Sequence, residues 1–118
     1  MGLSKVTLEI TNPENPKKSI QDEFLVDSGA FYTVLPKKMV DKLELKPEFN
    51  QDFSLADGST ISRPVGNAFI TFEGKKTASP VVLGKTHDSP LLGVLTLEGL
   101  GLILDPFQRK LHPAKLVL

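Results

Sequence analysis

The sequence predicts a single all-β, barrel-like domain with one or two short helices. Several segments alternate apolar and polar residues with a period of two, which is typical of strands with one buried face. Clusters of Gly, Pro, Asn and Asp separate these segments at short intervals, as in domains built of many short strands. The chain has 118 residues, 40% of them hydrophobic, which is enough for one compact core and too few for two. We therefore expect one domain over residues 1–118.

The first part of the chain predicts a hairpin and a buried strand that ends at an acidic residue. Apolar and polar residues alternate over 4–11, and the turn-forming segment 12–18 separates this strand from a second one that begins at Ile20. The apolar run 24–26 is typical of a strand buried on both faces. Asp27 follows it directly, so a carboxylate is expected at the end of a core strand.

A short helix and a second hairpin are expected next. Pro36 suits the first turn of a helix, and two apolar residues four positions apart predict a helix over 37–43. Further along, strands over 53–56 and 59–61 flank an Asp-Gly pair at 57–58. This pair supplies the positive φ angles of a tight two-residue hairpin turn.

The remainder of the chain continues the alternation of strands and turns. The expected elements are a strand over 68–72, a turn at 73–76, a buried strand over 81–83, a strand ending at 91–93, a helix of one or two turns over 94–98, a strand over 102–104 and a last strand candidate over 110–118.

Composition excludes several classes of function. Fourteen basic and fourteen acidic residues cancel, and no basic stripe is present that would bind nucleic acid or an anionic membrane. The chain has no cysteine, so disulfides, thiolate metal sites and thiol nucleophiles are excluded. His87 and His112 lack a second ligand at metal-binding spacing, so we expect neither metal nor cofactor. The start of the chain lacks a signal-peptide pattern and no apolar stretch approaches bilayer length, so the default expectation is a cytoplasmic protein without a membrane segment.

The residues that follow the strand at 24–26 form the main candidate motif, Asp27-Ser28-Gly29. A random chain of this composition would contain Asp-[Ser/Thr]-Gly roughly 7% of the time, but only about 0.5% of the time after three apolar residues. Taken alone, the motif is commonly an Asx turn whose carboxylate accepts hydrogen bonds from local amides. The sequence around it decides between this structural interpretation and a catalytic one.

That surrounding sequence resembles the paired signature of retroviral-type (retropepsin-like) aspartic proteases. Phe-Leu-Val-Asp-Ser-Gly-Ala at 24–30 is followed by Leu-Leu-Gly at 91–93, with Leu-Ala-Asp-Gly-Ser at 55–59 where the family has its flap hairpin. Val-Val-Leu-Gly at 81–84 falls where the family has the strand before the second motif. Residues 91–106 are most similar to the stand-alone archaeal and bacterial members. The resemblance implies a closed barrel-like acid-protease fold, one lobe per chain, that works as a homodimer on a polypeptide substrate.

The resemblance also implies roles for individual residues. Asp27 would be the catalytic carboxylate, the Ser28 hydroxyl would bond across the dimer, and Gly29 would let the substrate approach the backbone. Main-chain groups of Gly29, Ala30 and Ser59 would pair with an extended peptide as an added strand. The expected substrate-binding residues lie in the turn, the flap tip and the pocket walls: Ala30, Phe31, Ala56, Asp57, Gly58, Ser59, Val82 and Leu83.

Within the mechanism that the resemblance implies, the number of carboxylates also leads to a dimer. Peptide hydrolysis by this route needs one carboxylate to activate a water and a second, protonated one to polarise the scissile carbonyl. Each chain has one Asp-Ser-Gly, so a twofold dimer must bring Asp27 against its own copy. Two such carboxylates titrate as a coupled pair.

Two positions depart from the viral pattern. Phe31 and Val94 stand where viral enzymes usually have an acidic residue and its arginine partner.

Other enzyme classes fit the sequence less well. A serine nucleophile lacks an identifiable histidine base, and Asp27 with Asp57 as a glycosidase pair would lack a sugar-stacking surface in a chain without Trp. The main alternative is a dimeric peptide-binding module of the same fold that cleaves weakly or not at all.

Overall fold

The computed structural model describes residues 4–118 and confirms a mostly β fold with two short helices in that range. Residues 1–3, part of the N-terminal segment without a signal-peptide pattern, lie outside the described residues. In chain order the elements are β1 (Lys5–Asn12), β2 (Asn15–Val26), β3 (Thr33–Leu35), α1 (Lys37–Leu43), β4 (Phe49–Ser54), β5 (Thr60–Phe72), β6 (Lys75–Leu83), β7 (Leu91–Leu92), α2 (Val94–Gly99), β8 (Leu102–Asp105) and β9 (Lys110–Pro113).

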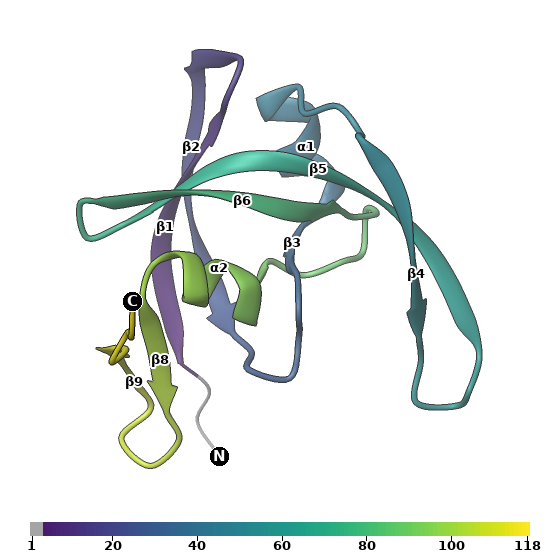
Figure 1. Cartoon of the computed structure of the whole chain (residues 1–118). Coiled ribbons are helices and arrows are strands. Elements are labelled where there is room, and N and C mark those ends of the chain that lie inside the picture. Colours follow the sequence, from purple (N-terminus) through teal and green to yellow (C-terminus); the bar gives the residue numbers. More distant parts are fainter. Residues whose placement is uncertain (1–3) are drawn as a thin grey trace.

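Seven of the strands form one sheet that closes on itself (Figure 1). Its order is β1-β2-β7-β3-β6-β5-β4, and β1 also pairs with β5. The pairing between β1 and β5 completes a ring of strands, and β4 extends from this ring as a partner of β5 alone. The closed barrel-like architecture expected from the sequence is therefore confirmed, with one barrel per chain. Strands β8 and β9 form a separate two-stranded sheet.

The first hairpin is confirmed, but its turn is shorter than the expected segment 12–18. Only residues 13–14 form the turn, and β2 already begins at Asn15. The Asn12 side chain makes this short turn possible. Its Nδ2 donates to the Leu43 carbonyl at 2.8 Å, and its Oδ1 accepts from the amide of the second turn residue at 2.8 Å. The Asn12 side chain thus bonds the short turn through Oδ1 and ties it to the end of α1 through Nδ2.

The apolar run at 24–26 is buried on one face rather than on both. Phe24 and Val26 are buried, whereas Leu25 is half-buried. Successive side chains of a strand point to opposite faces, and only one face of β2 lies on the core. The strand pairs on both edges, with β1 and with β7.

The hairpin of β4 and β5 is confirmed, but a five-residue loop over 55–59 joins its strands instead of a two-residue turn. The φ angle is positive at Gly58 (87°) and not at the residue before it, so the expected tight turn cannot form. That kind of turn occurs between β5 and β6 instead, where Glu73 and Gly74 have φ angles of 50° and 84°. Strand β5 has thirteen residues and runs from the hairpin into the barrel wall.

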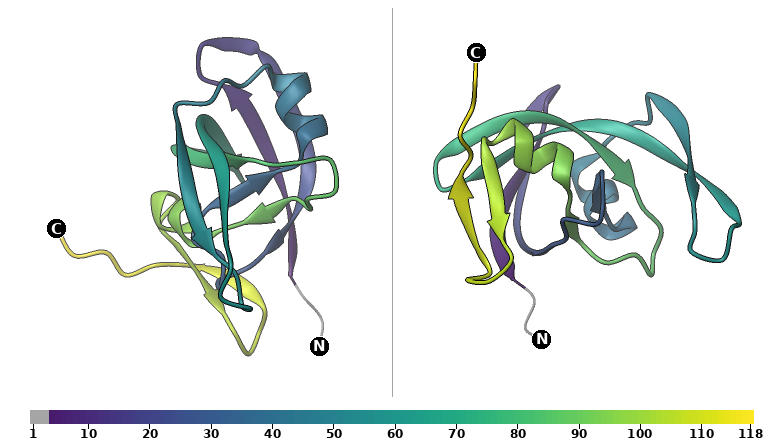
Figure 2. Two further views of the ribbon diagram at one scale, coloured as in Figure 1. Left: turned by 90° about the vertical axis from the view of Figure 1, so that its right-hand side faces the viewer. Right: turned by 60° about the horizontal axis from the view of Figure 1, so that its bottom comes forward.

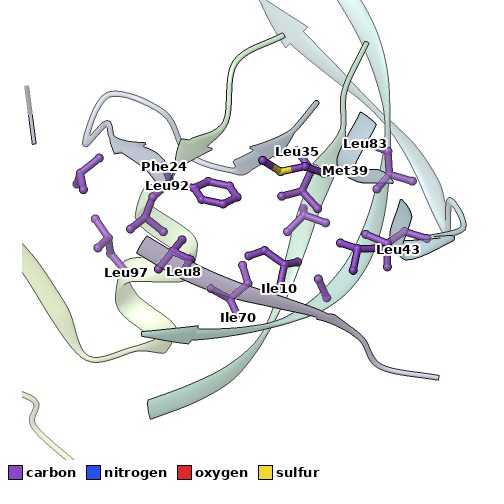
Figure 3. Packing of buried hydrophobic residues seen from close by; sticks show 14 residues of the cluster. Leu8, Ile10, Phe24, Leu35, Met39, Leu43, Ile70, Leu83, Leu92 and Leu97 are labelled. Carbon is purple, nitrogen blue, oxygen red and sulfur yellow. The ribbon is translucent and has the colours of Figure 1, made fainter. Parts of the chain in front are cut away.

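The core fills the barrel and extends under both helices (Figure 3). Helix α1 covers the residues predicted for it, and its Met39 and Leu43 face the core as their spacing indicates. The cluster consists of Leu8, Ile10, Phe24, Val26, Leu35, Met39, Leu43, Leu45, Ala68, Ile70, Val81, Leu83, Leu92 and Leu97.

The last strand is shorter than the candidate over 110–118. Strand β9 ends at Pro113, and residues 114–118 form no regular element. The Ala114 amide donates to the Gly101 carbonyl at 2.6 Å, so the contact with the residue before β8 continues one residue past the end of β9. The preceding helix α2 confirms the helix expected near 94–98.

The start of α2 is bonded directly to the loop between β2 and β3. The Val94 amide donates to the Ala30 carbonyl, and the Leu95 amide donates to the Phe31 carbonyl, both at 2.9 Å. These amides belong to the first turn of a helix, where main-chain donors have no partner within the helix. The loop supplies the missing acceptors, so the helix start and the loop position each other.

Gly93 makes this contact possible because it has no side chain. A Cβ atom at this position would lie 2.5 Å from the Tyr32 carbonyl carbon and oxygen and 2.9 Å from the Ala30 oxygen. These are main-chain atoms that cannot rotate away. The glycine of Leu-Leu-Gly is therefore required by the close approach of two backbone segments.

A buried set of hydroxyl groups supports the same junction. Thr33 Oγ1 accepts from the Gly93 amide at 3.0 Å and lies 2.5 Å from Thr96 Oγ1, which in turn lies 2.8 Å from Ser79 Oγ. Thr33, Thr96 and Ser79 come from β3, α2 and β6. Each buried hydroxyl has a partner, so the network adds specificity without leaving an unsatisfied polar group.

We predict that Gly93→Ala lowers the free energy of unfolding by about 3 kcal/mol, because its methyl group overlaps main-chain atoms that have little room to move. Denaturant unfolding at fixed protein concentration measures this change. Glu98→Ala, an exposed substitution in the same helix, is the control and should stay within about 0.5 kcal/mol of the parent protein. Equal stability of the two variants would contradict the close approach at Gly93.

Candidate active site

Asp27 lies where β2 leaves the sheet, and the surrounding main chain fixes its position. Its amide donates to the Leu92 carbonyl at 3.0 Å, and its carbonyl accepts from the Ala30 amide at 3.1 Å. Its carboxylate Oδ1 accepts from the Gly29 amide at 2.9 Å. The turn is thus an Asx turn with a half-buried carboxylate held at the end of a core strand.

The two residues after Asp27 are exposed and small. The Ser28 hydroxyl has no hydrogen-bond partner among residues 4–118. A Cβ atom on Gly29 would lie 3.2 Å from Asp27 Oδ1, so a larger residue there would crowd the carboxylate. The turn therefore presents one carboxylate and one hydroxyl with free bonding capacity.

A cavity of about 430 Å³ lies beside this turn. Its walls come from the loop after β2, from β3 and β6, from the hairpin β4–β5 and from the loop before β7. The lining is mainly apolar, with one basic and one acidic side chain. The lining residues are Gly29, Ala30, Phe31, Tyr32, Val34, Phe53, Ile61, Arg63, Val82, Asp88, Ser89 and Leu91.

Three aromatic rings link the Asp27 loop to the hairpin. Tyr32 makes an edge-to-face contact with Phe31, with ring centroids 5.3 Å apart, and a second one with Phe53 of β4 at 5.7 Å. Such contacts contribute about 0.5–1.5 kcal/mol beyond the burial of their surface. The hairpin is therefore packed against the loop that carries Asp27.

The structure brings only part of the predicted substrate-binding set to the cavity. Ala30, Phe31 and Val82 line it, together with Gly29. Leu83 does not, because neighbouring residues of a strand face opposite sides. With Val82 on the cavity, Leu83 is 6% exposed and belongs to the core cluster (Figure 3). The expectation that Leu83 forms part of a pocket wall is therefore wrong.

The loop 55–59 lies at the tip of the hairpin and does not line the cavity; Ala56, Asp57, Gly58 and Ser59 are all exposed. Asp57 organises this loop through Oδ1, which accepts from the Ser59 amide at 2.9 Å and from the Ser59 hydroxyl at 2.5 Å. The Ser59 hydroxyl, followed by the Ser59 amide, holds the pKa of the Asp57 carboxyl below its ordinary value. The side chain of Asp57 thus closes a loop that is too long for a tight turn.

Main-chain groups expected to pair with a peptide are largely engaged within the chain. Ala30 donates to Asp27 and accepts from Val94, and Ser59 donates to Asp57 Oδ1 and accepts from the Leu55 amide. Among residues 4–118, the Gly29 carbonyl has no such partner. Of the three residues expected to add a peptide strand, Gly29 therefore offers the free acceptor.

The sequence did not indicate Tyr32, Phe53, Ile61 or Arg63 as site residues. A period-two interpretation of the hairpin would have found three of them. Phe53 pairs with Ile61 across the two strands, and Arg63 is two residues further along β5 on the same face. The signal was hidden because the expected strands ended at residue 61.

The turn after β2, the tip of the hairpin β4–β5 and the turn between β8 and β9 lie at the same end of the molecule (Figures 1 and 2). Among residues 4–118 there is no group of three or more acidic or histidine side chains that could hold a metal ion. In the same range neither helix has the length and apolar character needed to cross a membrane.

Comparison with known proteins agrees with this arrangement. Residues 18–98 match the family described as gag-polyprotein putative aspartyl protease. No curated protein matches the sequence. The structure is similar to the protease of equine infectious anaemia virus (EIAV) complexed with the inhibitor HBY-793, with a TM-score of 0.61 and 17% identity over 99% of this chain and 94% of that chain.

The solution structure of the simian foamy virus (mac) protease is also similar, with a TM-score of 0.54 and 19% identity over 76% of this chain and 87% of that chain. At such identities the two structures establish the fold, and the family match establishes the membership. The finer placement among stand-alone archaeal and bacterial members stays a prediction. Because the matched segment covers more than half of the chain and carries both Asp-Ser-Gly and Leu-Leu-Gly, the protein belongs to the gag-polyprotein aspartyl protease family and has the retropepsin-like fold.

Proposed function

We propose that this protein is an aspartic endopeptidase that hydrolyses extended polypeptides as a homodimer, with a water activated between the two Asp27 carboxylates. The observation that carries the proposal is the Asp27 turn, which fixes a carboxylate at the end of a core strand, while Gly29 and Ala30 of the same turn line a mainly apolar cavity of about 430 Å³. Extended peptides with apolar side chains fit such a cavity. Family membership makes acid-protease chemistry the first interpretation of this carboxylate.

The second carboxylate of the dyad is supplied by a second copy of the chain. The one acidic residue among the described residues that line the cavity, Asp88, accepts from the Lys85 amide through Oδ2 at 2.7 Å and so belongs to its own loop. A twofold axis beside the Asp27 turn would bring the two Asp27 side chains together in one symmetric cleft. The unpartnered Ser28 hydroxyl lies next to Asp27 and supports a contact across this axis.

Exposed apolar residues near the same end support a second copy as well. Ile103 and Phe107 of the β8–β9 hairpin are 55% and 92% exposed. The turn of this hairpin lies at the end of the molecule that carries the Asp27 turn (Figure 1). Large apolar side chains that are exposed to solvent near one another are typical of a protein–protein interface.

The proposed chemistry needs one proton shared by the dyad, because two carboxylates about 3 Å apart cannot both ionise. The ionised Asp27 takes a proton from the water as its oxygen adds to the scissile carbonyl carbon. The protonated Asp27 donates a hydrogen bond to the carbonyl oxygen, which becomes negatively charged. The tetrahedral intermediate then breaks its C–N bond as a proton reaches the leaving amine.

We predict that Asp27→Asn reduces peptide cleavage at mildly acidic pH by about 10³-fold or more, because an amide cannot act as the general base. Turnover of an unfolded protein substrate measures the loss. Asp41→Asn, an exposed substitution in α1, is the matched control and should retain the parent rate. Sedimentation should show a dimer for both variants, since the substitution changes the charge and not the fold.

The outcomes of that experiment separate the candidate functions. Undiminished cleavage by the Asp27→Asn protein would rule out the mechanism. A monomer at concentrations well above those of the assay would also contradict it, because one chain supplies only one such carboxylate. Peptide binding without cleavage by the parent protein would indicate the alternative function, a dimeric peptide-binding module.

The hairpin β4–β5 acts in this proposal as a flap whose tip is the loop 55–59. When its carboxylate is ionised, Asp57 holds the loop in its hydrogen-bonded conformation, here called closed. Because the pKa of Asp57 lies below its ordinary value of 3.8, these hydrogen bonds are present above that pH and are lost as the pH falls through the lowered value. The loop therefore stays closed at the mildly acidic pH at which a singly protonated dyad works.

We predict that Asp57→Ala increases the hydrogen-exchange rate of the Gly58 and Ser59 amides at pH 5, because the carboxylate acceptor is gone. Nuclear magnetic resonance or mass spectrometry measures this exchange. Asp57→Asn, which keeps an acceptor oxygen, should preserve part of the protection. Equal exchange in the parent and Asp57→Ala proteins would show that the side chain does not organise the loop.

A further inference from the structure

We infer that Arg63 makes the site selective for substrates in which an acidic side chain lies two positions from the apolar side chain that fills the cavity. This inference rests on the proposed function of the site. It adds a charge requirement to a cavity whose other walls are mainly apolar.

Arg63 lines the cavity because side chains alternate between the two faces of strand β5. Ile61 and Arg63 share one face of the strand, and both line the cavity. Across the hairpin, Phe53 is paired with Ile61, and Gln51 is paired with Arg63. The apolar part of the hairpin thus lies toward its tip, and the guanidinium-bearing residue lies two pairs nearer its base, on the same face.

The guanidinium of Arg63 has most of its hydrogen-bonding capacity free. It carries five N–H donors and stays charged at all relevant pH values. One donor, on Nη1, contacts the carbonyl of the adjacent Ser62 at 3.2 Å. The ion pairs formed within residues 4–118 do not include Arg63. A half-buried cation on a cavity wall without an anionic partner is ready to bind one from a ligand.

The other charge on the cavity, Asp88, directs the ligand rather than neutralising Arg63. Its carboxylate does not come within ion-pair distance of the guanidinium among the described contacts, and its Oδ2 already accepts from the Lys85 amide. An acidic side chain is attracted to Arg63 and repelled by Asp88. The two groups together therefore give the cavity a charge direction.

An extended substrate matches this arrangement by its own geometry. Side chains two residues apart in a strand lie on the same face, about 6–7 Å from each other. Ile61 and Arg63 have the same spacing on β5. A peptide lying along the flap can therefore place an apolar side chain against Phe53 and Ile61 and a carboxylate against Arg63.

The experiment measures the affinity of matched peptides for the full-length Asp27→Asn protein, which binds without cleaving. The peptides differ in one residue, Glu, Gln or Lys, placed two positions before or after an aromatic residue. The Glu peptide in one of the two orders should bind about tenfold more tightly than its Gln counterpart, as for a hydrogen-bonded charge pair that is partly exposed. Arg63→Met, added to Asp27→Asn, should remove this preference, and Arg63→Glu should transfer it to the Lys peptide.

Two controls separate a specific contact from general charge attraction. Lys38→Met removes one exposed positive charge from α1, outside the cavity, and should leave the preference unchanged. The preference for Glu over Gln should also disappear as the pH falls below about 4.3, where the glutamic acid of the peptide becomes neutral. Arg63→Lys should retain part of the preference, because it keeps the charge without the planar donor pair.

The inference would be overturned by an equal preference in the Arg63→Met protein, by equal affinities for Glu and Gln peptides, or by a lack of binding of every peptide. Its failure is distinguishable from failure of the proposed function. If the parent protein cleaves peptides without regard to the acidic residue, the endopeptidase stands and the inference falls. If the Asp27→Asn protein selects Glu peptides but the parent protein cleaves none, the selectivity stands and the endopeptidase falls.

Discussion

The rest of the structure depends on the close approach of two backbone segments at Gly93. A side chain here would overlap main-chain atoms of the loop between β2 and β3. Because Gly93 has no side chain, the first amides of α2 can donate to the loop carbonyls, and the Leu92 carbonyl accepts a hydrogen bond from the Asp27 amide. Asp27 is therefore positioned by main-chain hydrogen bonds to a segment far away in the sequence. Phe31 and Val94, which depart from the viral pair of charged residues, take part in the same junction through their main chains.

Features that depend on local order could be predicted from the sequence. Apolar periodicity, and the residues that interrupt it, predict the strand that ends at Asp27, the short helix α1 and the end of β7 at a glycine. The hairpin β4–β5 was predicted for the same reason. The functional interpretation of Asp27 needed more, because an Asx turn has this local geometry in proteins of any function. The order of the motifs along the chain supplied the remaining information.

Features that depend on a side chain reaching beyond its own strand could not be predicted. Asn12 bonds the first turn to the end of α1, and Asp57 holds the five-residue flap loop together, each through side-chain contacts that a propensity does not include. In a continuous apolar run such as 81–83, the sequence does not show which residue faces the core, so Val82 and Leu83 were both assigned to the cavity. Arg63 was missed because the flap strands continue further than the turn signals indicated.

Strand β5 combines two kinds of position along its thirteen residues. Its second half is fixed by the core, where Val65, Ala68 and Ile70 are fully buried. Its first half carries Ile61 and Arg63 on the partly open cavity. Substitutions in the first half change what the cavity contacts without changing core volume, so most should cost little stability. Under the proposed function, substrate preference can therefore change by single substitutions in one half of a strand, while the other half maintains the barrel.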